Sequence, residues 1–219
     1  MPDFTIVLGN KRYSSWSLRG WLLLKQTGAS FDEIVIPLDQ PQTKAALLQH
    51  SPASKVPALK TRDGVVWDSL AIAEYLNECF PKAGLWPLDF AARTLARSVA
   101  AEMHSGFSAL RQRMPMDVCA DKAAHGRNAL AEPPVAADMA RIVEIWSDCR
   151  KRFGEGGDFL FGEWSAADAM YAPVATRFTT YAVPLNGAAA AYRDAVMAAP
   201  DMVEWITAAK AETWTIDYD

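Results

Sequence analysis

Residues 56–76 read Val-Pro-Ala-Leu-Lys-Thr-Arg-Asp-Gly-Val-Val-Trp-Asp-Ser-Leu-Ala-Ile-Ala-Glu-Tyr-Leu. The Asp63-Gly64 step lies between two short apolar runs, 57–60 and 65–67, and predicts a β-hairpin, because Asp-Gly fits the tight turns that join antiparallel strands. A helix is expected over 69–79, because apolar residues recur there at helical spacing. This succession is typical of an α/β domain.

The residues before this stretch predict two more strands and two more helices. The run Phe-Thr-Ile-Val-Leu at 4–8 reads as a buried strand, and 31–38 reads as a second. Helices are expected at 14–26, with Gly28 as the stop, and at 43–49. A strand-helix-strand unit crosses over right-handedly, so these two strands should be parallel. The predicted order is β-α-β-α-β-β-α.

Alanine usage divides the chain. Residues 1–88 contain 8 alanines and residues 89–219 contain 30, so the second half should be almost entirely helical. We therefore expect an α/β domain over 1–80, a linker over 81–88 and an all-helical domain over 89–219. Within the last, 89–114 reads as one long helix. Further helices are expected around 139–146 and over 165–181, 188–197 and 202–211.

Composition excludes several classes of function. The 22 basic and 26 acidic residues nearly cancel, which disfavours a nucleic-acid-binding protein. No apolar run approaches the ~18 residues of a membrane span, and the first residues lack the pattern of a signal peptide. Three widely spaced cysteines and three histidines indicate neither a disulfide framework nor a metal site. We expect a cytoplasmic protein without metal or membrane partners.

Hydroxyl groups gather where the first predicted helix begins, at Ser14, Ser15 and Ser17. Such residues cap the free amides of a helix start. The same position suits a second role, because a helix N-terminus carries partial positive charge and stabilises a thiolate. No cysteine lies in this loop, so the thiolate would belong to a ligand, and a serine hydroxyl would donate a hydrogen bond to its sulfur.

Two further motifs have both a structural and a ligand-binding interpretation. Pro57 is either an edge or turn residue or, if cis, frees the backbone of Val56 to pair with an extended peptide. Asp68 and Ser69 either cap the next helix or hold the ammonium and carboxylate of a ligand. The pattern Ser165-Ala-Ala-Asp168 has one favoured interpretation, a capping box that folds a helix.

The order and spacing of these motifs resemble the cytosolic glutathione transferases over essentially the whole chain. Ser-Ser-x-Ser-x-Arg at 14–19 is similar to the serine-type classes, especially zeta, and residues 102–111 resemble a bacterial branch of the superfamily. The resemblance implies a thioredoxin-like N-terminal domain followed by an all-α domain. It also implies a homodimer that uses glutathione, without a metal, in detoxification chemistry.

The resemblance assigns roles to residues of this chain. Ser14 matches the serine that activates the glutathione sulfur, with Ser15 beside it. Val56 matches the residue whose backbone pairs with the cysteinyl part, Pro57 the cis-proline, and Asp68 and Ser69 the clamp for the γ-glutamyl group. Lys55 stands near the position of a group for the glycyl carboxylate. The candidates for the electrophile pocket come from the helical half: His104, Phe107, Arg111 and Met114.

Departures from the family pattern leave the reaction open. Trp16 replaces the cysteine of the zeta class, and Asp68 is shorter than the usual Glu or Gln. Arg177 does not stand at the distance from Asp168 where maleylacetoacetate isomerases hold a substrate carboxylate. The main expectation is conjugation of glutathione to small, mostly hydrophobic electrophiles. The alternatives are a cis-trans isomerase of maleylacetoacetate type and a non-catalytic binding protein.

Overall fold

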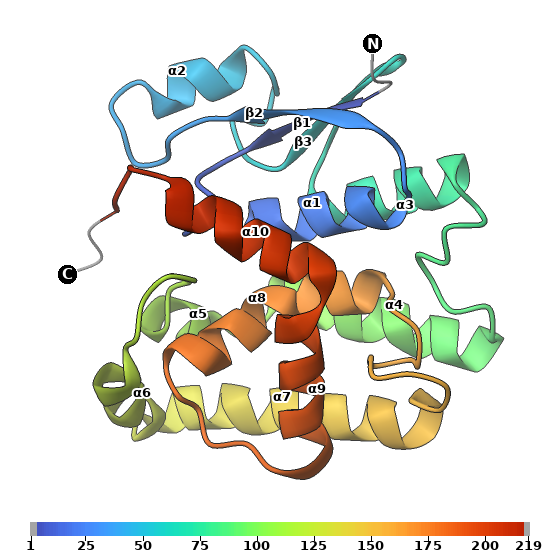
Figure 1. Ribbon diagram of the computed structural model, residues 1–219, viewed down its shortest axis with the longest axis vertical. Coiled ribbons are helices and arrows are strands. Elements are labelled where there is room, and N and C mark those ends of the chain that lie inside the picture. Colours follow the sequence, from blue (N-terminus) through green and yellow to red (C-terminus); the bar gives the residue numbers. More distant parts are fainter. Residues whose placement is uncertain (1–3, 217–219) are drawn as a thin grey trace.

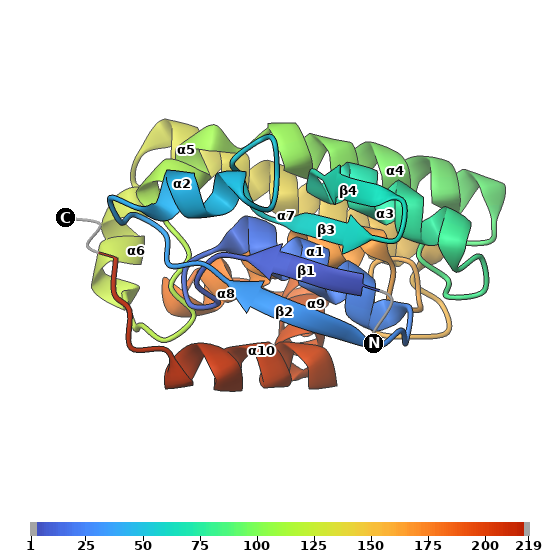
Figure 2. The ribbon, with the colours of Figure 1, turned by 90° about the horizontal axis from the view of Figure 1, so that it is seen from above.

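The sheet of the N-terminal half has four strands and mixed direction. A computed structural model describes residues 4–216 of the chain. Strand β1 (Phe4–Leu8) pairs in parallel with β2 (Phe31–Val35) and antiparallel with β3 (Ala58–Thr61), which forms a hairpin with β4 (Gly64–Trp67). The order across the sheet is β2-β1-β3-β4 (Figure 2). The parallel pair and the hairpin are both as predicted.

Helices cover both faces of this sheet (Figure 1). Helices α1 (Ser15–Gln26) and α3 (Ser69–Cys79) lie between the sheet and the rest of the protein, and α2 (Thr43–Leu48) covers the opposite face. The alternation of side chains along β1 produces this division. Ile6 and Leu8 join the large core with α1 and α3, whereas Val7 packs on Leu47 of α2 in a smaller cluster.

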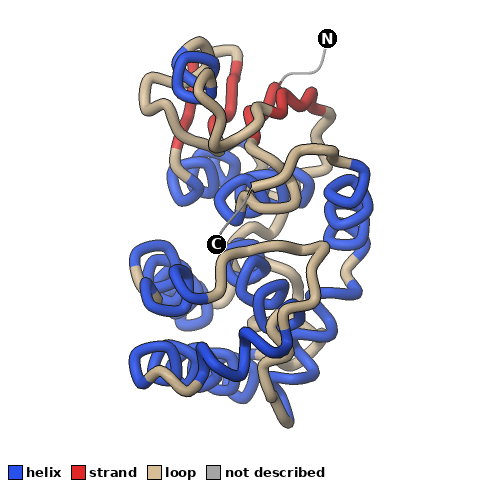
Figure 3. Tube along the Cα trace, turned by 90° about the vertical axis from the view of Figure 1, so that its left-hand side faces the viewer, coloured by secondary structure: helices blue, strands red, loops and turns tan. Residues whose placement is uncertain are grey.

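The second half of the described chain is helical (Figure 3). Its helices are α4 (Phe90–Ser105), α5 (Ser108–Arg113), α6 (Ala123–Leu130), α7 (Pro133–Phe153), α8 (Ala166–Thr180), α9 (Gly187–Ala198) and α10 (Pro200–Ala211). Helix α8 is the centre of this half, and Thr179 is its one residue that is not buried. It packs against α1, α4 and α9, so it joins the two halves of the chain. No helix among the described residues is long and apolar enough to cross a membrane.

The start of α8 confirms the predicted capping box. In one half of the box, the side chain of Ser165 accepts a hydrogen bond from the amide of Asp168. In the other half, the carboxylate of Asp168 accepts hydrogen bonds from the amide and hydroxyl of Ser165, both at 2.8 Å. Asp168 also accepts from the amide of Leu160 at 3.0 Å and has no exposed surface. It therefore fixes the loop before α8 as well as the helix start.

The prediction of one helix over 89–114 is wrong. The chain forms α4 and α5, and the break lies at Gly106 and Phe107. Phe107 has a left-handed backbone with φ 59°, and a Cβ on Gly106 would lie 2.8 Å from the carbonyl oxygen of Glu102. This close approach needs glycine. The short helix α6 was also not predicted.

Candidate active site

A cleft of ≈ 760 Å³ opens where α1, α3 and the loop before β3 meet α4. Almost all of its wall comes from the N-terminal half, and His104 of α4 is the contribution of the helical half. The wall consists of Trp16, Leu38, Leu47, Ala53, Ser54, Lys55, Val56, Pro57, Trp67, Asp68, Ser69 and His104. All five residues assigned to glutathione binding by sequence therefore meet in one cavity.

The Val56–Pro57 peptide bond is cis. Among the described residues, no hydrogen bond engages the amide or the carbonyl of Val56. An edge of backbone with free donor and acceptor groups can add an extended peptide as a further strand. Lys55, next to it, is exposed at the rim of the cleft. This segment thus offers both a backbone edge and a positive charge.

Asp68 and Ser69 lie at the start of α3. Ser69 has no exposed surface, yet its Oγ atom has no hydrogen-bond partner in the part of the chain that the structure describes. A buried hydroxyl without a partner costs free energy, and because Ser69 lines the cleft, a ligand bound there would supply that partner. Asp68 has a positive φ of 76°, which Asp tolerates better than most residues, and its Oδ1 accepts from the amide of Leu70 at 2.8 Å. Its Oδ2 lies 2.7 Å from Nε2 of His104.

Ser14 is the N-cap of α1 and has 5% exposure. Its Oγ accepts from the amide of Ser17 at 3.2 Å and shares a 2.8 Å hydrogen bond with the Ser17 hydroxyl, which in turn accepts from the amide of Gly9 at 2.8 Å. Ser15 follows as the first residue of α1 and is also buried. Capping is thus the role that the structure displays, and a role toward a thiol stays a prediction.

Trp16 forms the wall beside these serines. The guanidinium groups of Arg19 and Arg111 lie 4.5 and 5.1 Å from its ring centre, and the His104 ring packs against it in a T-shaped arrangement with 5.1 Å between ring centres. Arg19 is buried and donates from Nε to the carbonyl of Met170 at 3.0 Å, and its Nη1 has no partner among the described residues. Burial, followed by the charge of Arg111, lowers the pKa of Arg19, and burial lowers the pKa of Arg111. Positive charge therefore lies directly behind this wall.

The four residues predicted for an electrophile pocket lie in different surroundings. His104 lines the cleft. Arg111 lies behind Trp16 and donates to the carbonyls of Met103 and His104. Phe107 and Met114 are buried in the hydrophobic core. The predicted common face assumed one continuous helix, and the helix break at Phe107 interrupts it. Substrate contacts by these four stay predictions.

Sequence reasoning did not assign a role to two features of this site. Ser17 links Ser14 to the end of β1, and its spacing of three residues from the helix cap was a visible signal. Glu212 contacts the loop before Ser14 from about 200 positions away, as described below, and no local pattern marks it.

The comparisons with known proteins agree with this geometry. Residues 13–79 match the family described as glutathione S-transferase, N-terminal domain, and residues 127–208 match glutathione S-transferase, C-terminal domain. The chain belongs to the glutathione S-transferase superfamily. A probable maleylacetoacetate isomerase of Caenorhabditis elegans is 27% identical over 164 residues, which is 75% of each chain.

Two solved glutathione transferase structures share the fold. A glutathione transferase homologue from Burkholderia with bound glutathione has a TM-score of 0.71 at 21% identity and covers 97% of this chain and 100% of its own. A maleylpyruvate isomerase, described as a bacterial zeta-class glutathione S-transferase, has a TM-score of 0.72 at 21% identity, with 96% and 100% covered. Both neighbours confirm the predicted glutathione transferase fold.

Among the described residues, no group of three or more His, Cys, Asp or Glu could hold a metal ion.

Proposed function

We propose that this glutathione S-transferase binds glutathione as an extended peptide in the cleft and transfers its thiolate to small, mostly hydrophobic electrophiles. The observation that carries the proposal is the set of unsatisfied polar groups in the lining of the cleft. Within residues 4–216, the buried Ser69 hydroxyl has no partner, and no hydrogen bond engages the backbone amide or carbonyl of Val56 beside the cis-proline.

Each end of the tripeptide has a chemical match in the wall. The γ-glutamyl carboxylate would accept hydrogen bonds from Ser69 and the start of α3, where the helix dipole favours negative charge. Its ammonium would pair with the Asp68 carboxylate. The cysteinyl backbone would pair with Val56, and Lys55 would attract the glycyl carboxylate. Held in this way, the thiol would point toward the start of α1, where Ser14 and Ser15 lie next to Trp16 of the cleft wall.

Ser14 would act as a hydrogen-bond donor and not as a base, because a neutral hydroxyl does not take up a proton at neutral pH. The bond that it shares with Ser17 can run in either direction, because hydroxyl protons rotate. When Ser17 donates to Ser14, the Ser14 proton becomes available to a thiolate. The partial positive charge at the start of α1 would add to this stabilisation.

The electrophile would occupy the part of the cleft walled by Trp16, Leu38, Leu47 and Trp67. An apolar wall with few polar groups suits small hydrophobic substrates. The test is a turnover assay with glutathione and a series of halides, epoxides and peroxides, together with calorimetric titration of glutathione alone. The proposal expects binding and turnover of at least one electrophile class. Failure of glutathione to bind would contradict it.

A second candidate is a glutathione-dependent isomerase of maleylacetoacetate type. The observation that favours it is the positive charge behind Trp16, where the buried Arg19 and the half-buried Arg111 each have a guanidinium nitrogen without a partner in the described chain. Substrates of this class carry carboxylates, which such groups attract. Turnover of maleyl compounds without consumption of glutathione would identify the isomerase, and net loss of the free thiol would identify the transferase.

We further propose that the protein is a cytoplasmic homodimer. The described structure leaves Cys79, Cys119 and Cys149 as free thiols, which suits a reducing compartment. Leu88 and Phe90, at the start of α4, are 91% and 75% exposed. Such large neighbouring apolar side chains are typical of a surface that another subunit covers.

A further inference from the structure

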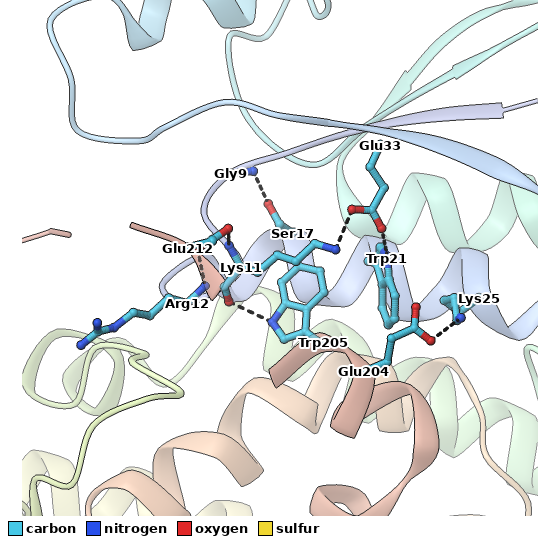
Figure 4. Close-up of polar contacts among 10 residues, drawn as sticks. All are labelled: Gly9, Lys11, Arg12, Ser17, Trp21, Lys25, Glu33, Glu204, Trp205 and Glu212. Carbon is cyan, nitrogen blue, oxygen red and sulfur yellow. Dashed lines mark hydrogen bonds and ion pairs between the residues drawn. The ribbon is translucent and has the colours of Figure 1, made fainter. Parts of the chain in front are cut away.

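The loop that carries Ser14 is held by the last helix of the fold (Figure 4). Glu212 follows directly after α10, and its carboxylate accepts hydrogen bonds from two successive backbone amides. Oε1 binds the amide of Lys11 at 2.7 Å and Oε2 binds the amide of Arg12 at 3.1 Å. Two amides that bind the two oxygens of one carboxylate fix both the position and the direction of this peptide segment.

The other side of the same segment is held as well. The indole Nε1 of Trp205, a buried residue of α10, donates to the carbonyl of Lys11 at 2.9 Å. The Lys11 ammonium lies over the rings of Trp21 and Trp205, at 5.4 and 5.3 Å from their centres, and pairs with Glu33 at 2.6 Å. Both backbone polar groups of Lys11 are therefore bound by α10 and the residue that follows it.

Arg12 is fixed by another part of the helical half. Its guanidinium binds both oxygens of Asp117, at 2.7 and 2.9 Å, and its carbonyl accepts from the amide of Val118 at 3.2 Å. The Lys11–Arg12 segment thus has its backbone partners between 100 and about 200 residues downstream. Because these partners belong to the helical half, the position of the Lys11–Arg12 segment depends on the position of that half.

Ser14 comes two residues later, at the end of the same turn. The carbonyl of Asn10 accepts from the amides of Tyr13 and Ser14, at 3.2 and 2.8 Å, so Lys11 and Arg12 lie inside the turn that this carbonyl closes. A displacement of these two residues therefore shifts the N-cap of α1. The hydrogen bond from a serine to a thiolate depends strongly on distance and angle.

We propose that Glu212 is a positioning residue of the active site: its carboxylate holds the turn that sets the Ser14 hydroxyl against the glutathione sulfur. The inference rests on the proposed function of Ser14. The alternative is that Glu212 only anchors the end of the chain to the fold. That alternative predicts a loss of stability without a change in the ionisation of the bound thiol.

The experiment compares Glu212→Ala and Glu212→Gln with a matched control, Glu204→Gln. Glu204 also belongs to α10, but its exposed carboxylate binds the Lys25 ammonium at 2.8 Å and not the loop (Figure 4). The measurement is the ultraviolet thiolate absorbance of bound glutathione against pH, below the unfolding temperature of each variant. Titration with S-methylglutathione, which has no thiol, reports the binding of the rest of the tripeptide.

We expect Glu212→Ala to raise the pKa of the bound thiol by about half a unit to one unit and to lower kcat/KM for glutathione at neutral pH by about three- to tenfold. Glu212→Gln, which keeps one accepting oxygen, should lie between Glu212→Ala and wild type. The affinity for S-methylglutathione should change by less than about twofold in all three variants, since Val56, Asp68 and Ser69 are untouched. The control should titrate as wild type does.

Two results would overturn the inference, and they differ from each other. If Glu212→Ala lowers the unfolding temperature while its thiol titration coincides with that of wild type, Glu212 is an anchor only and the role of Ser14 stands. If bound glutathione in the wild-type protein titrates as free glutathione does, the proposed activation of the thiol fails, and the inference fails with it.

Discussion

His104 and Asp68 come from opposite halves of the chain, and Nε2 of His104 lies 2.7 Å from Oδ2 of Asp68. Asp68 caps α3 beside the unsatisfied Ser69 hydroxyl, whereas His104 belongs to the last turn of α4. The bond crosses the cleft wall at the point where the ammonium of glutathione is proposed to bind. It therefore couples the clamp proposed for glutathione to the helical half of the chain.

This coupling predicts that the two side chains act as a unit in glutathione binding. Asp68→Asn should weaken binding by about tenfold or more, because a hydrogen bond to a charged group contributes about 1.5–3 kcal/mol. His104→Ala should have a smaller effect, and the double variant should resemble Asp68→Asn alone. Calorimetric titration of the four proteins gives the coupling free energy. Strict additivity of the two single effects would show that the pair does not act together.

The capping box predicts a stability effect that is separate from the cleft. Asp168→Ala leaves the amides of Leu160 and Ser165 without their acceptor inside the core. Each such buried donor costs about 1–3 kcal/mol, so a loss of at least about 2 kcal/mol in the free energy of unfolding is expected. Denaturant titration measures it, and glutathione affinity at a permissive temperature should stay unchanged. An unaltered midpoint would contradict this role.

The cysteines should differ in reactivity. Burial raises the pKa of Cys149 to about 12, so the thiol stays protonated at neutral pH and also out of reach of reagents. Cys79, at the end of α3, is exposed. Iodoacetamide at neutral pH, followed by mass spectrometry of peptides, should label Cys79 in the native protein and Cys149 only after unfolding. Equal labelling rates for the two would refute the buried position of Cys149.

The exposed apolar pair at the start of α4 gives a prediction about assembly. Light scattering at micromolar concentration should report twice the chain mass of 24.0 kDa. Replacing both Leu88 and Phe90 by Asp should shift the protein toward the monomer, because charged groups in an apolar interface lose their hydration. A wild-type mass equal to that of one chain would refute the proposed dimer.

Local patterns in the sequence were sufficient for much of the fold. The Asp63-Gly64 turn, the parallel crossover and the Ser165–Asp168 capping box each depend on neighbouring residues, and each is present. The cis bond at Val56–Pro57 was available only from the family resemblance. The break in the helix at Gly106 was not predicted, because helical spacing continues on both sides of it and a single glycine is tolerated inside helices.

The candidate site was also predictable from the sequence only in part. Lys55, Val56, Pro57, Asp68 and Ser69 were assigned by their order in the chain, and they line one cavity. The bond between Asp68 and His104, the stacking of Arg111 on Trp16, and the Glu212 contact join residues that only the packing of the helical half brings together. Such long-range polar contacts have no periodicity, so no reading of local sequence reveals them.

The central claim is that the start of α1 stabilises the thiolate of bound glutathione through Ser14. The most direct measurement is the ultraviolet thiolate absorbance of bound glutathione as a function of pH, in wild type and in Ser14→Ala. The account predicts that the pKa of the bound thiol is lower in wild type by about one to two units, since one hydrogen bond to a charged partner contributes about 1.5–3 kcal/mol. Coincident titrations of the two proteins would contradict it and leave Ser14 as a helix cap alone.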